Sequence, residues 1–280
     1  MQSLWMLLAS LAFAVMGALV KAGAAHHSTV ELVFYRGLFG TVVIGAFVLA
    51  TGRSLRTPHV RIHLGRGISG VASLLMWFYA IATLPLAMAT TLNYTSPMFV
   101  AALSALLYKR RDERALGATI ALGFVGIVLV LRPTFAADQL VAGLAGAGSG
   151  FLAALAYLSV RRLGELGEPE WRVVFYFSLL MTVACGAWMA IAGATAPRWS
   201  DVPVLGGIGA SATVAQLALT RAYSRGKTLL TSNLAYATVL LSALMGLLFW
   251  GETLPWLAWA GIALVIASGV AATVVTARRG

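Results

Sequence analysis

Long apolar runs alternate with short polar connections along the 280 residues of the chain. A helix that crosses a bilayer needs roughly 20 mainly apolar residues, and continuous runs of that length favour helices over membrane β-strands. Ten runs qualify: 3–20, 32–50, 67–83, 87–108, 115–131, 141–160, 173–192, 202–223, 229–250 and 256–275. The pattern therefore predicts an all-α membrane protein with ten transmembrane helices and no separate soluble domain.

Composition supports the same class. Hydrophobic residues make up 60% of the chain and charged residues only 10%, whereas a soluble domain carries about 25% charged residues. The net charge of +11 comes from short clusters between the apolar runs and not from one basic face, so we expect a lipid bilayer and no nucleic acid as partner. Cys185 is the single cysteine, which excludes an internal disulfide.

The positions of the cations predict the orientation. With the N-terminus in the cytoplasm, 16 Lys and Arg fall on the cytoplasmic side and three (Lys21, Arg132 and Arg198) fall outside. This bias is the positive-inside pattern of membrane proteins. We therefore expect a multi-pass protein of a bacterial-type inner membrane with both termini in the cytoplasm.

The chain also contains an internal repeat. A shift of 142 residues overlays 65–133 on 207–275 without a gap, and it brings Tyr94 onto Tyr236. Two halves, 1–137 and 138–280, then hold five helices each, and an odd number inverts one half relative to the other. Inverted repeats are typical of secondary transporters that work by alternating access around a site near the bilayer midplane.

Several segments resemble a known family. Residues 31–36, 92–97 and 250–252 are similar to the corresponding segments of the drug/metabolite transporter superfamily, in its ten-helix EamA branch. Lys109-Arg110 depart from the Gly-Glu pair that members often carry after the fourth helix. The resemblance implies a secondary transporter of small organic metabolites, with exporters of amino acids, including aromatic ones, as a well-populated branch. The alternatives are import or export of another metabolite or drug.

Enzyme and channel functions fit the sequence less well. The chain has no Gly-x-Ser-x-Gly or His-Glu-x-x-His motif and no acid pair within a span, so we expect neither catalysis nor a metal or cofactor. Because no Asp, Glu or His lies in the central part of a span, we expect facilitated diffusion or coupling at the outer rim, not a midplane proton relay. Small residues in the fifth and tenth helices allow packing in either a monomer or a homodimer.

Polar and aromatic residues within the spans are the candidates for a substrate site. Pro97 frees the Asn93 carbonyl in the fourth helix, so this helix is either kinked along a wet cavity or packed against its neighbours. The sequence does not determine which face of the third helix points inward. For Gln216, both substrate contact and an interhelical hydrogen bond stay open. The candidates suit a small zwitterion in an uncharged pocket: Ser73, Trp77, Tyr79, Asn93, Tyr94, Tyr157, Gln216, Asn233 and Tyr236.

Charged residues near the outer ends of the helices are candidates for a gate. Lys21, Glu31 and Arg36 fall on the same side of the predicted topology, and pairing among them offsets the cost of burial. The alternative is that they extend to the membrane interface as anchors. All four histidines are expected in connections, where His59 and His63 form at most a weak metal site.

Overall fold

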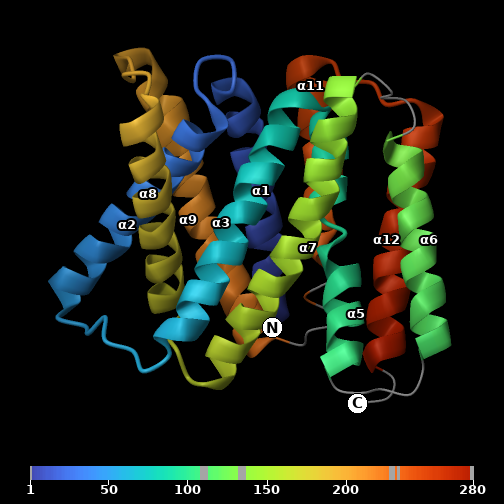
Figure 1. Ribbon diagram of the computed structural model, residues 1–280, viewed down its shortest axis with the longest axis horizontal. Helices are drawn as coiled ribbons and strands as arrows, with labels where there is room; N and C mark the ends of the chain where they lie inside the picture. The colour runs from blue at the N-terminus through green and yellow to red at the C-terminus, as the bar shows by residue number, and fades with distance from the viewer. Residues whose placement is uncertain (1, 108–112, 132–136, 227–230, 232–233, 278–280) are drawn as a thin grey trace.

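The protein is a bundle of helices in the computed structural model, which describes residues 2–107, 113–131, 137–226, 231 and 234–277 (Figure 1). No strand occurs in these ranges. The helices are η1 (Gln2–Leu4), α1 (Trp5–Gly23), α2 (Thr29–Thr51), α3 (Val60–Thr83), α4 (Leu86–Asn93), α5 (Ser96–Leu107), α6 (Glu113–Leu131), α7 (Ala137–Glu165), α8 (Glu170–Ala192), η2 (Trp199–Asp201), α9 (Val202–Arg225), α11 (Ala237–Trp250) and α12 (Trp256–Ala277).

These helices give the ten passes that the sequence predicts. Within the described residues, six helical stretches are long and apolar enough to cross a membrane by themselves. The other passes contain α4 with α5, α6, α11 and α12. The start of α1 and the end of α12 lie on the same face of the bundle in Figure 1, and we call it the terminal face. The all-α ten-helix fold is confirmed.

Local sequence explains where α2 begins and ends. Ser28 and Glu31 form a capping box, in which the Ser28 amide donates to Glu31 Oε2 at 2.7 Å and the Glu31 amide donates to Ser28 Oγ at 3.3 Å. Gly52 ends the helix with a φ of 62°, a left-handed conformation that glycine adopts without steric cost. The connection to α3 therefore starts at a fixed point.

The largest helix contacts join the two halves of the chain. They are the pairs α1 with α9, α2 with α8, α3 with α7, and α6 with α12. In an inverted repeat, α3–α7 is the counterpart of α1–α9, whereas α2–α8 and α6–α12 each join a helix to its own counterpart. The contact between α4 and α11 joins the fourth pass to the ninth, which are also counterparts. The packing thus has the pattern that two inverted five-helix repeats require.

Two of the passes are interrupted, and a tyrosine lies at each interruption. Tyr94 and Thr95 separate α4 from α5, and Pro97 falls in the first turn of α5, where proline is tolerated. Tyr236 lies immediately before α11. The sequence shift of 142 residues relates these two tyrosines, so the repeats share a discontinuous helix, the kind of element that forms transport sites.

Small residues let α6 pack on α12 within the monomer. A Cβ added at Gly126 would lie 3.0 Å from the Gly261 carbonyl oxygen, so the two helix backbones approach closely at this point. The small residues of α6 therefore pack against α12 of the same chain. This is the first of the two predicted alternatives, packing within the monomer or in a homodimer.

The start of the third pass differs from the prediction. We expected the apolar span to begin at residue 67, with His63 and Arg66 in a connection. However, α3 begins at Val60, and both side chains are only 3% exposed. The charged residues did not end the helix because other helices surround them.

Candidate functional site

Two arginines from α2 and α3 meet inside the bundle. Arg36 and Arg66 each lie about two turns after the start of their helices, and α2 and α3 enter from opposite faces. Both residues are 3% exposed. Their guanidinium carbons lie 5.5 Å (Arg36) and 3.8 Å (Arg66) from the centre of the Phe177 ring in α8. Both groups thus lie within cation–π distance of the same aromatic ring.

The two guanidinium groups keep several donors without a partner. Arg36 Nη1 donates to the Met181 sulfur at 3.4 Å, and Arg66 Nη2 donates to Gln216 Oε1 at 3.2 Å. Neither arginine forms an ion pair with any carboxylate in the part of the chain that the structure describes. Nε and Nη2 of Arg36, and Nε and Nη1 of Arg66, are buried without a hydrogen-bond partner. Because an unpaired buried charge is costly in a membrane, these donors are candidates for binding an anionic group.

Glycines make room for this arrangement. A Cβ added at Gly70 would lie 2.1 Å from Arg66 Nη1 and 2.8 Å from the Phe177 ring. The Arg66 side chain therefore runs along α3 over the bare backbone of Gly70, from the start of the helix toward the middle of the bundle.

Aromatic residues extend the site away from the arginines. Tyr157 of α7 lies near both guanidinium groups, and its ring stacks on Tyr223 with centroids 5.3 Å apart. Tyr94 lies near Tyr157 and Tyr223, and Tyr236 also lies near Tyr223. The tyrosines at both helix interruptions therefore belong to the same cluster as the arginine pair.

Other predicted site residues bond within the protein. The Asn93 amide donates to Ser149 Oγ at 2.9 Å, and Ser73 Oγ donates to the Ser149 carbonyl at 2.8 Å. Trp77 packs edge to face against Phe13 and Phe78, and its Nε1 has no hydrogen-bond partner. These contacts favour the structural role for Asn93 and Ser73.

Two predicted site residues are not seen in the cluster of arginines and tyrosines. Tyr79 is 38% exposed on α3, because residues two apart in a helix point to opposite sides and Trp77 faces inward. Tyr79 therefore lies on the outer face of α3, away from this cluster, and its contact with substrate stays a prediction. Asn233 lies outside the described residues.

The prediction of an uncharged interior is wrong. Arg36 was assigned to an outer gate and Arg66 to a connection, yet both are buried together. Gln216 does face the interior, as predicted, and it accepts the bond from Arg66. The one sequence signal for Arg66 was Gly70 one turn later, a small residue on the same face that leaves space for a long side chain.

At the face opposite the terminal face, Lys21 of α1 and Glu252 after α11 form an ion pair. Lys21 Nζ also donates to the Leu84 carbonyl at 2.9 Å, and the Leu86 amide donates to Glu252 Oε2 at 2.8 Å. Glu31 accepts instead from the Thr195 amide and from Ser28. The predicted pairing among Lys21, Glu31 and Arg36 is therefore wrong, because each finds a partner that is distant in the sequence.

At the terminal face, Glu168 between α7 and α8 contacts the connection between α2 and α3. It accepts hydrogen bonds from Thr57 Oγ1 and from Arg172 Nη1 (2.9 Å for the latter), and His63 Nε2 lies 3.7 Å from its carboxylate. Burial raises the pKa of Glu168, but these hydrogen bonds and the nearby charges of Arg172 and His63 outweigh burial and leave the pKa lowered. This latch, Glu168 with Thr57, Arg172 and His63, joins the two halves.

The fold and the site define a membrane transporter built from two repeats. The chain belongs to the EamA-like transporter family, whose model matches residues 1–132 and 140–274. It is 32% identical over 267 residues to the pseudopaline exporter CntI of Pseudomonas aeruginosa, which covers 94% of this chain and 93% of that protein. It is 29% identical over 277 residues to a riboflavin transporter of Vibrio cholerae, with 95% and 90% covered. A solved crystal structure superposes with a TM-score of 0.71 at 25% identity and covers 100% of this chain and 99% of that one.

Proposed function

We propose that the protein exports small organic solutes that carry a carboxylate, with apolar or aromatic amino acids as the first candidates, and that Arg36 and Arg66 bind the carboxylate. The observation that supports this proposal is the pair of buried guanidinium groups with four unpartnered donor atoms between them. Arginine binds carboxylates through two parallel N–H···O bonds, which fix the orientation of the solute as well as its charge.

The neighbouring aromatic residues fit the rest of such a solute. Phe177 and the stacked Tyr157 and Tyr223 rings offer faces for an apolar or aromatic side chain. The Tyr94 and Tyr236 phenols offer acceptors for an ammonium group. Among the described residues around the arginines, no carboxylate competes for them.

Transport would proceed by alternating access between the two faces. The Lys21–Glu252 pair closes one face and the Glu168 latch closes the other, and each joins the two halves of the chain. We infer that the ion pair breaks while the Glu168 latch stays closed, and the reverse. Lys21 and Glu252 are then the gate residues. Glu31 contributes the neighbouring hydrogen bond with the Thr195 amide. Because no acidic residue lies among the described residues that contact the arginines, we propose facilitated diffusion and not a midplane proton relay.

The relatives support a small organic solute and either direction. The Pseudomonas aeruginosa relative is named as an exporter, whereas a Rickettsia bellii relative that is 21% identical over 257 residues is named as an S-adenosylmethionine uptake transporter. The cation bias of the sequence supports a terminal face that lies in the cytoplasm. Because the named relatives include an exporter and an uptake transporter, import is the second candidate. Transport assays on oriented vesicles distinguish export from import.

The test is transport by the purified protein in liposomes loaded with a mixture of amino acids and related metabolites. We expect carboxylate-bearing solutes with apolar side chains to leave the vesicles with saturable kinetics, and their esters and amides to stay. Release of amides and esters as fast as of the free acids would contradict the proposal. Flux that does not saturate would indicate a channel, and conversion of the solutes would indicate an enzyme.

A further inference from the structure

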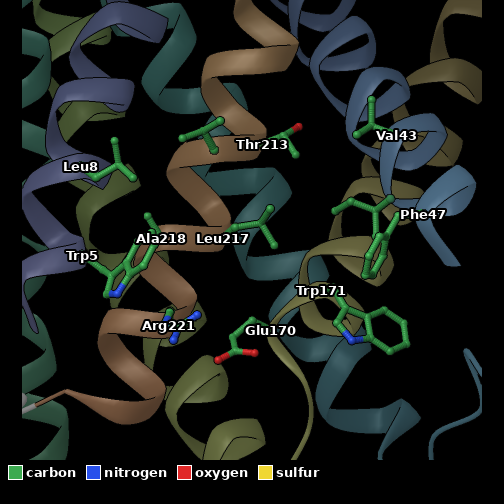
Figure 2. Close-up of a pocket in the computed structure, with 12 residues that line it drawn as sticks. Trp5, Leu8, Val43, Phe47, Glu170, Trp171, Thr213, Leu217, Ala218 and Arg221 are labelled. Atoms are coloured by element: carbon green, nitrogen blue, oxygen red, sulfur yellow. The ribbon is translucent and has the colours of Figure 1, made fainter. Parts of the chain in front are cut away.

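An apolar groove of about 500 Å³ opens on the side of the bundle near the terminal face (Figure 2). Nine of its twelve lining side chains are apolar, and they come from α1, α2, α8 and α9. Several of them are widely exposed, including Trp5 (40%), Val43 (44%) and Phe47 (40%). In a membrane protein such a surface faces the lipid tails, and a concave one holds a tail in a defined place.

The mouth of the groove carries charge, whereas its wall does not. Glu170 and Arg221 lie together at one end of the view in Figure 2, and Thr213 and Val43 lie toward the other. Trp5 and Trp171 flank the charged end. Tryptophans and arginines at the end of an apolar surface mark the level of the lipid headgroups.

Charges at this mouth do not cancel. Glu170 is paired with Arg225 at 2.9 Å, and Glu168 is paired with Arg172 at 2.9 Å. Arg53 and Arg221, by contrast, form no ion pair with the described residues. The mouth therefore has two cations beyond those that the carboxylates neutralise.

Aromatic residues of the groove hold these two arginines on either side of it. The Arg221 guanidinium lies 4.9 Å from the centre of the Trp5 ring, and its Nε donates to Gln2 Oε1 at 3.1 Å. The Arg53 guanidinium lies 5.2 Å from the Phe47 ring and 5.9 Å from the Trp171 ring. Both cations are thus fixed beside residues that also contact whatever fills the groove.

We propose that this groove is a binding site for an anionic phospholipid of the leaflet at the terminal face, with an acyl chain along α2 and α9 and the phosphate between Arg53 and Arg221. Basic pockets between membrane helices bind anionic headgroups in this way. The apolar wall selects a lipid over a free phosphate ion, because a free ion gains nothing from Leu8, Val43 or Leu217. The site is separate from the arginine pair in the bundle interior, so its test does not depend on the transported solute.

Native mass spectrometry of the purified protein measures the lipids that it retains. We expect phosphatidylglycerol to be retained over phosphatidylcholine, and each of Arg53→Gln and Arg221→Gln to weaken its retention roughly fivefold, as removal of one cation at a membrane surface predicts. Arg56→Gln removes an equal charge from the same connection, but Arg56 has no cation–π contact with a groove residue of the kind that Arg53 makes with Phe47 and Trp171. This control should leave retention unchanged. Soluble glycerol phosphate should not displace the lipid.

A second variant tests the apolar part of the site. Leu217 is partly exposed in the groove, so Leu217→Trp should fill the space without disturbing the core and should lower phosphatidylglycerol retention at unchanged Tm. Equal retention of neutral and anionic lipid by all variants would overturn the proposal. So would displacement of the lipid by a transported solute, which would identify the groove as a part of the transport route.

Discussion

Lys21 in α1 and Glu252 after α11 form an ion pair that joins the two halves of the chain at the face opposite the terminal face. The pair is only partly shielded, since the two side chains are 16% and 15% exposed. The Glu252 carboxylate also accepts from the Leu86 amide at the start of α4. One carboxylate therefore connects α1, α4 and the end of α11.

Glu252→Gln should open this face more often, because it removes the charge from the pair with Lys21. Hydrogen bonds to charged groups contribute about 1.5–3 kcal/mol, so the open population should rise about tenfold or more. The measurement is the labelling rate of a cysteine at Met88, which is buried in α4, in a Cys185→Ala background. Thr253→Ala, next to the pair and exposed, is the control, and equal labelling in both variants would contradict the gate role.

Glu168→Gln should weaken the latch at the terminal face. The lowered pKa of Glu168 means that the carboxylate stabilises the folded state fully above its unfolded-state pKa of about 4.3, and that this contribution disappears as the pH falls through the lower folded-state value. We therefore expect the variant to have a Tm about 5 °C lower at pH 7. The difference should persist at pH 5 and disappear only below about pH 4. A difference that vanishes by pH 6 would mean that the latch does not hold this carboxylate ionised.

Gly70→Ala should displace the Arg66 guanidinium without unfolding the protein. The added Cβ would lie 2.1 Å from Arg66 Nη1 and 2.8 Å from the Phe177 ring, so both groups must shift. Alanine favours the helix by about 0.5–1 kcal/mol over glycine, which offsets part of that cost. Solute affinity should fall about tenfold, with a small decrease in Tm. Gly65→Ala lies on the same helix with nothing within 4 Å of its added Cβ, so it should bind normally; the two variants are compared by equilibrium binding. Equal affinities would show that Arg66 does not bind the solute.

Ser149→Ala separates structure from transport in the fourth pass. The change leaves the Asn93 amide without its acceptor, and an unsatisfied buried donor costs about 1–3 kcal/mol. Thermal unfolding should therefore shift to lower temperature, whereas the KM for transport should stay within about twofold. A raised KM at unchanged Tm would indicate that Asn93 contacts the substrate.

Hydropathy identified the ten passes because a membrane requires long apolar runs whatever their neighbours are. The repeat likewise related Tyr94 to Tyr236, and the structure places both at interruptions of their passes. Both features follow from residues that are close in the chain or from a constant shift along it. They could therefore be predicted from the sequence.

The arginine pair could not be predicted in the same way. We used charged residues to mark the ends of spans, which excluded Arg66 from a helix that begins at Val60. Whether a charge is buried depends on Phe177 and Gln216, which are more than 100 residues away in the sequence. The partner of Lys21 could not be predicted for the same reason. Glu31 is the acidic residue closer along the chain, but Lys21 pairs with the distant Glu252.

Binding of a free acid and of its amide to Arg36→Gln and Arg66→Gln variants tests the central claim most directly. The solute pair is one amino acid found to be transported and its carboxamide, and the measurement is the Kd of each by calorimetry. We predict that each variant binds the acid roughly 10- to 100-fold more weakly, as loss of a charge-assisted bond requires, and binds the amide as the unchanged protein does. If acid and amide weaken equally, or if neither changes, the buried arginines do not bind the carboxylate.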